Sequence, residues 1–213
     1  MRPAALVCAF TLFLPLAAFA QEPPPKIGPF VVDVHGTVPR FPEEQALVDS
    51  RAGLSSIAEL PGAGLGLQVG AHLYVLRWRV ITLGIGGEFA TGHASRTPPE
   101  GSTDLVATTE RFQSLGTQLS FNFGNGNGWS YISGGIGQST WLLEPAGTPA
   151  TPQDTERLKT INYGGGARWF ARPHLAFSID VRFYAVNPGS PYQGSPGSPR
   201  TTLLIIGAGV SIK

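Results

Sequence analysis

Ionisable and amide side chains recur at alternate positions within otherwise apolar segments of this chain. The clearest case is residues 175–184, where large apolar residues occupy every odd position and Asp180 and Arg182 fall between them. In a β-strand, alternate side chains point to opposite faces. Such a strand would place five large apolar groups on one face and an acid–base pair on the other.

The same alternation in the other apolar segments assigns eight polar residues to one shared face. The set comprises Asp33, His35, Gln68, His72, Glu88, Arg168, Asp180 and Arg182. Because an unpaired buried charge is costly, we expect hydrogen bonds and salt bridges to join these groups. They would form either a polar plug or a narrow pore whose charges select ions. The plug is favoured, since side chains nearly fill a barrel of eight strands.

Strands must position these residues, and prolines mark where the strands end, because proline cannot donate a ladder hydrogen bond. The eight predicted strands span residues 28–38, 63–76, 79–93, 110–123, 129–142, 157–170, 174–186 and 200–212. Long and short connections alternate between them, and the fourth connection is a glycine/asparagine turn over 124–128. Alternating connections and an apolar outer face are typical of transmembrane barrels. We predict an all-β, eight-stranded antiparallel up-and-down transmembrane β-barrel.

A soluble β-sandwich is the alternative fold. It would account for one strand with an apolar and a polar face, but it gives no reason for the alternating connections.

Aromatic residues near the strand ends predict two girdles at the membrane interfaces. Trp129 and Trp141 begin and end one strand, and would lie ~30 Å apart along the membrane normal at a tilt of ~40°. The predicted girdle comprises Phe30, Phe123, Trp129, Trp141, Trp169 and Phe183.

The N-terminus is typical of a secretory signal peptide. Arg2 precedes an apolar run, and residues 18–20 fit a small-residue cleavage site. We therefore expect a signal peptide over 1–20, a Pro-rich tail over 21–27 and one barrel domain over 28–213. Without residues 1–20 the chain has 14 basic and 14 acidic residues and no cysteine. This composition excludes disulfides, thiolate metal sites and a basic surface for nucleic acid.

The pattern as a whole resembles the small outer-membrane β-barrels of Gram-negative bacteria, the OmpA-transmembrane-domain and OmpW-like "porin family" barrels. In the last strand, Gly207 is followed by Val210 and Ile212, which is similar to the signal read by the barrel-assembly machinery. The family usually ends on an aromatic residue, where this chain has Lys213. The resemblance implies a monomer in the outer membrane, in contact with outer-membrane lipids and lipopolysaccharide. The assembly machinery would be its partner during biogenesis.

These observations favour a non-catalytic barrel with a structural or surface-interaction role exerted through its external loops. A narrow channel for ions or small solutes is the alternative. A lipid-modifying enzyme is a third hypothesis, because His93 and Ser95 share a strand face and superficially resemble the His-x-Ser pair of lipid A deacylases. The following residues, Arg96-Thr97-Pro98, do not match that motif. No residue pattern indicates a cofactor or metal site, so we expect neither.

Overall fold

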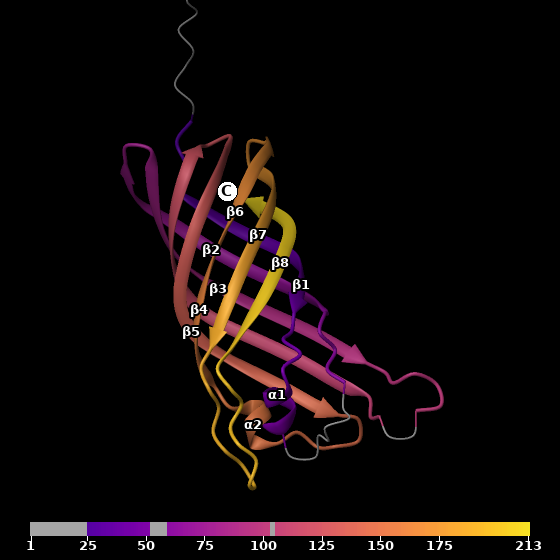
Figure 1. Ribbon diagram of the computed structural model, residues 1–213. Helices are drawn as coiled ribbons and strands as arrows, with labels where there is room; N and C mark the ends of the chain where they lie inside the picture. The colour runs from indigo at the N-terminus through magenta and orange to yellow at the C-terminus, as the bar shows by residue number, and fades with distance from the viewer. Residues whose placement is uncertain (1–24, 52–58, 103–104) are drawn as a thin grey trace, which may run out of the picture.

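The computed structural model describes residues 25–51, 59–102 and 105–213, and it contains a closed barrel (Figure 1). Eight strands follow one another around the barrel, each antiparallel to both neighbours. The strands are β1 (Phe30–Arg40), β2 (Leu65–Trp78), β3 (Ile81–Arg96), β4 (Thr108–Asn125), β5 (Gly128–Pro145), β6 (Leu158–Arg172), β7 (Leu175–Val186) and β8 (Thr201–Ile212). The predicted fold class is confirmed.

All eight predicted strands are present, with boundaries that agree within three residues. The largest differences lie at the long-loop end, where β3, β4 and β5 continue beyond the predicted limits. Their pairing extends without a break to Arg96–Thr108 and Thr108–Pro145, and these strands project past their neighbours in Figure 1. Prolines end the extension at positions 98 and 145, because proline cannot prolong the ladder.

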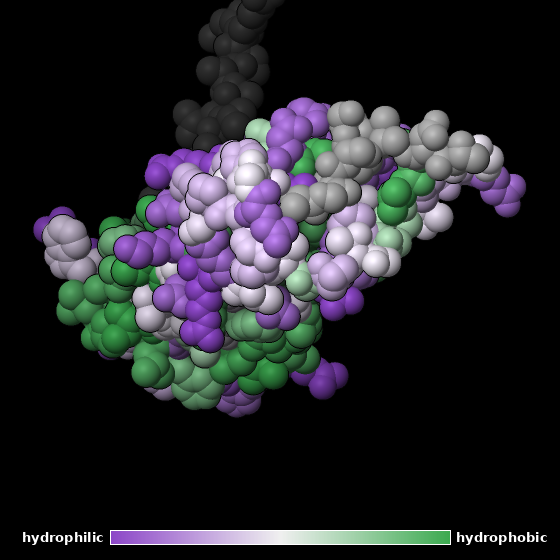
Figure 2. All heavy atoms as spheres, turned by 90° about the horizontal axis from the view of Figure 1, so that it is seen from below, coloured by the Kyte–Doolittle hydropathy of each residue, from purple (hydrophilic) through white to green (hydrophobic). Residues whose placement is uncertain are grey.

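The outer wall is apolar and the interior is polar. On β7, Phe177 is 54% exposed, whereas Asp180 and Arg182 are each 1% exposed. Viewed from the long-loop end, the loops are mainly polar and hydrophobic residues gather on the flank of the barrel (Figure 2). This arrangement is the inverse of a water-soluble barrel and matches a wall that faces lipid.

The two short helices of the described residues, α1 (Gln45–Asp49) and α2 (Pro152–Thr155), both lie in the long connections. In the part of the chain that the structure describes, no helix is long and apolar enough to cross a membrane.

The barrel interior is layered along its axis. Apolar side chains from the long connections and strand ends, including Phe41, Leu47, Phe112, Trp141 and Leu203, pack at the long-loop end. A second apolar cluster of Ile27, Val31 and Trp129 packs with Tyr74 and Phe170 near the short turns. The polar residues lie between these two clusters, so neither end of the barrel opens directly onto them.

The end of the Pro-rich tail takes part in closing the short-turn end. Pro25 accepts a backbone hydrogen bond from Gly126 in the β4–β5 turn at 2.5 Å, and Ile27 is buried. Lys213, which follows β8, places its ammonium group 3.9 Å from the ring centroid of Phe170. Residues 1–24, which include the predicted signal peptide, lie outside the described residues.

The predicted aromatic girdle is wrong at two positions. Trp129 and Trp141 are each only 3% exposed and point into the barrel. Both lie at odd positions of β5, as do buried Tyr131 and Ser133, so both face the interior. Their spacing along the membrane normal therefore does not place them at a membrane interface. Phe30, Phe123 and Trp169 do lie on the outer face, and Phe183 is half-buried there against Tyr163.

Close approach of the strands requires glycine at some inward positions, and Gly166 on β6 provides a test. A Cβ at this position would lie 2.1 Å from the Ile179 carbonyl oxygen and 2.7 Å from the Tyr131 hydroxyl. We expect Gly166→Ala to lower the free energy of unfolding by about 1–3 kcal/mol, because the backbone must shift. Denaturant titration of the refolded protein in detergent measures the effect.

The matched control is Gly134→Ala on β5. A Cβ there would be in ordinary contact, 3.5 Å from the Asn162 carbonyl oxygen. This variant should be neutral or slightly stabilising, because alanine restricts the unfolded chain. Equal costs for the two substitutions would contradict the steric explanation.

Candidate functional site

The structure places all eight residues of the predicted polar cluster inside the barrel, where they are buried. They line one cavity together with Gly70 and Tyr131. Its volume is about 10 Å³, which is room for about one water molecule. The centre of the lumen is therefore filled by side chains.

The first ion pair of the cluster links β6 to β1. Arg168 donates from Nε and Nη2 to the two carboxylate oxygens of Asp33, at 2.8 and 2.6 Å. Ser211 on β8 donates to the same carboxylate at 2.5 Å. The guanidinium also lies over the Tyr131 ring, 4.0 Å from its centroid. Such a two-point, charge-assisted contact fixes both partners in orientation.

The second ion pair is a three-way contact around Arg182. Its guanidinium donates to Asp180 at 3.1 and 2.9 Å, and Nε lies 3.0 Å from Glu88 Oε2. Gln68 donates to both carboxylates, at 2.7 Å to Glu88 and 3.2 Å to Asp180. Tyr131 donates to Asp180 at 2.6 Å, and Tyr184 donates to Glu88.

Neutral donors complete the hydrogen bonding of the carboxylates in the cluster. Three carboxylates face two guanidinium groups, and the two tyrosine hydroxyls and the Gln68 amide supply the remaining hydrogen bonds. Sequence reasoning missed both tyrosines, although each lies at the same alternate positions of its strand as the inward-facing polar residues.

The two histidines of the cluster lie beside these ion pairs. His35 adds a link to β7, with Nε2 2.7 Å from the Ser178 hydroxyl. His72 lines the same cavity.

At the long-loop end, residues 41–51, 146–157 and 187–200 form a folded layer that we call the loop cap. Arg51 and Asp154 pair within it at 3.1 Å, with side chains 4% and 3% exposed. Arg51 also donates to the Trp141 carbonyl oxygen at 3.0 Å. Burial lowers the pKa of the Arg51 guanidinium, and the Asp154 carboxylate opposes that shift. The ion pair thus joins the first long connection to the third.

Further hydrogen bonds attach the last connection to the same layer. Gln153 donates to the Ser190 carbonyl oxygen at 2.9 Å, and Glu156 accepts from the Ser190 amide and hydroxyl at 2.9 and 2.7 Å. Beneath the cap, Trp141 donates its indole N–H to Glu110 at 3.0 Å. Trp141 therefore serves as an anchor for the cap instead of a membrane-interface residue.

The candidate catalytic pair is not assembled. His93 and Ser95 both lie on the exposed face of β3, opposite Arg111 and Thr109 of β4. Within the described ranges, neither side chain has a hydrogen bond to the other or to a carboxylate that could orient the histidine. The described residues also contain no group of three or more His, Cys, Asp or Glu that could hold a metal ion.

Comparisons of sequence found no matching family model and no matching curated protein. Three solved structures with similar folds are Neisserial surface protein A, the attachment invasion locus protein Ail of Yersinia pestis bound to the heparin analogue sucrose octasulfate, and the outer membrane enzyme PagL. Their TM-scores are 0.57, 0.51 and 0.43, and their sequence identities are 11%, 13% and 14%. The alignments cover 87%, 86% and 86% of this chain and 97%, 97% and 99% of those chains.

The chain therefore has the fold of the small eight-stranded outer-membrane β-barrels of Gram-negative bacteria. That fold by itself does not decide between catalytic and non-catalytic roles, because one barrel can carry unrelated sites.

Proposed function

We propose that this chain is a non-conducting outer-membrane barrel with a structural or surface-interaction role, exerted through its external loops and without catalysis. The observation that carries the proposal is the filled lumen. Ion conduction needs a continuous polar path, whereas the cavity inside the polar cluster has a volume of about 10 Å³. Apolar clusters lie on both sides of it.

The loop cap supports a role at the external face. Its three connections are joined by a buried ion pair and by several hydrogen bonds, so a partner would meet an ordered surface. Binding to an ordered surface avoids the entropic cost of fixing mobile loops. The cap is hydrogen-bonded to β5 at Trp141 and Leu143, and β3–β5 project beyond the other strands (Figure 1).

The proposal includes an outer-membrane location reached through a cleaved signal peptide, assembly by the barrel-assembly machinery and a monomeric state. Sheet closure supports the monomer, because β1 pairs with β8 and leaves no strand edge to recruit a second copy.

Planar-bilayer recording of the refolded chain, residues 21–213, tests the filled lumen. We expect no discrete conductance steps, because Arg182, Asp180 and Glu88 are fixed to one another across the lumen. Heat-modifiable migration on a gel shows in parallel that the protein is folded. Conductance steps whose size changes in Asp180→Ala or Glu88→Ala would contradict the proposal and favour a channel.

A further inference from the structure

The outer wall of the barrel carries a groove that runs from its middle toward its long-loop end, on β2 to β6. Three adjoining hollows of about 700, 670 and 540 Å³ make up this groove, and Thr117 and Ile136 line all three. Neither residue faces the lumen, since both are exposed on the lipid side of β4 and β5. We call this feature the wall groove.

The two ends of the wall groove differ in chemistry. Toward the middle of the barrel its walls are Leu73, Ile85 and Leu119, with glycine at position 134. Toward the long-loop end the amides of Gln113 and Gln138 join Phe89 and Leu115 in the lining. The apolar end therefore faces the depth of acyl chains, and the polar end faces the depth of lipid headgroups.

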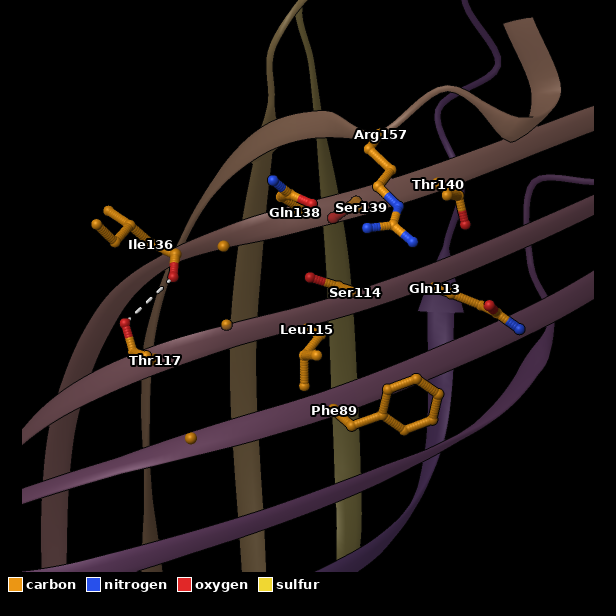
Figure 3. A pocket seen from close by; sticks show the side chains of 13 residues that line it. Phe89, Gln113, Ser114, Leu115, Thr117, Ile136, Gln138, Ser139, Thr140 and Arg157 are labelled. Carbon is orange, nitrogen blue, oxygen red and sulfur yellow. Dashed lines mark hydrogen bonds between the residues drawn. The ribbon is translucent and has the colours of Figure 1, made fainter. Parts of the chain in front are cut away.

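Two cations stand at the polar end. Arg157 lines the first hollow and Lys159 lines the third. Because they flank buried Leu158 at the start of β6, both point to the outer wall. Figure 3 shows Arg157 reaching across β5 on the side of Thr140 and Gln113, while Ile136 and Thr117 lie at the opposite end of the view. Lys159 pairs in register with Gln138.

We propose that the wall groove binds a phosphate-bearing lipid of the surrounding outer leaflet. An acyl chain would lie in the groove along Ile136 toward Leu119, and the phosphate would accept hydrogen bonds from Arg157, Lys159 and the glutamine amides. Charge complementarity selects a phosphate over a neutral headgroup, since guanidinium and ammonium donors bind phosphate oxygens strongly. The inference rests on the proposed outer-membrane location and is independent of the filled lumen.

Native mass spectrometry of the refolded chain in non-ionic detergent tests the site. The probes are bis-phosphorylated lipid A and the same glycolipid with both phosphates removed. We expect the phosphorylated lipid to bind at least about tenfold more tightly, and the double variant R157Q/K159Q to remove most of that difference. Thr117→Trp, which fills the groove from the lipid side, should weaken binding of both lipids.

The matched control is R77Q/R172Q, which removes two cations at the short-turn end and should leave lipid binding unchanged. Equal binding of the two lipids by the wild-type chain would overturn the inference. So would retention of phosphate selectivity in R157Q/K159Q, or its loss in the control. Heat-modifiable migration of each variant separates a lost site from a failure to fold. Planar-bilayer recording tests the filled lumen in a separate experiment.

Discussion

Arg168→Met is expected to lower the free energy of unfolding of the barrel by about 3–5 kcal/mol. The variant leaves the Asp33 carboxylate buried with only the Ser211 hydroxyl as a hydrogen-bond donor. A carboxylate in that position has lost its paired counter-charge, so the cost approaches that of an uncompensated buried charge. Reversible denaturant unfolding in detergent or lipid vesicles measures it.

Two controls show whether the loss comes from the ion pair. Arg172→Met, at the exposed end of the same strand, should change stability by at most about 0.5 kcal/mol. The double variant D33L/R168M removes both charges and should be more stable than Arg168→Met alone. A double variant as unstable as the sum of its single changes would show that Arg168 acts through packing on Tyr131 and Trp129 and not through its charge.

Asp154→Ala is expected to open the loop cap without unfolding the barrel. Asp154 accepts hydrogen bonds from the Thr151 amide and hydroxyl and from the Leu143 amide, and it pairs with Arg51. Its loss leaves the Arg51 guanidinium buried without a carboxylate, which corresponds to about 3–5 kcal/mol of local stability. Amide hydrogen exchange over residues 45–51 and 152–157 should therefore accelerate by about 100-fold or more.

The control for this change is Asp49→Ala in α1. Asp49 is exposed and accepts a side-chain hydrogen bond from Gln45 at 3.0 Å, so exchange in the cap should be nearly unchanged. Exchange that accelerates equally throughout the strands in Asp154→Ala would mean that the cap and barrel unfold together. Unchanged protection in the cap would show that the Arg51–Asp154 pair does not hold it.

The strands could be predicted from sequence because their signal is local. Alternation in β7 assigns Asp180 and Arg182 to one face and Phe177 to the other without knowledge of any neighbour, and the prolines mark the ends. The same parity is present around Trp129 and Trp141. Because the spacing of the two tryptophans matches the membrane thickness, it predicts that they lie on the outer face, which is wrong. Tyr131 and Ser133, which lie between them at the same alternation, indicate the interior.

The sequence by itself determined the class of fold and the ionisable and amide members of the luminal cluster, though not its two tyrosines, since side-chain direction in a strand depends only on position along that strand. Only the tertiary structure decided which groups meet. Arg168 and Asp33 are 135 residues apart in the chain and are brought together by closure of the barrel. The size of the remaining cavity, the loop cap and the wall groove likewise depend on how strands from distant segments align, and alternation within one strand carries no information about that alignment.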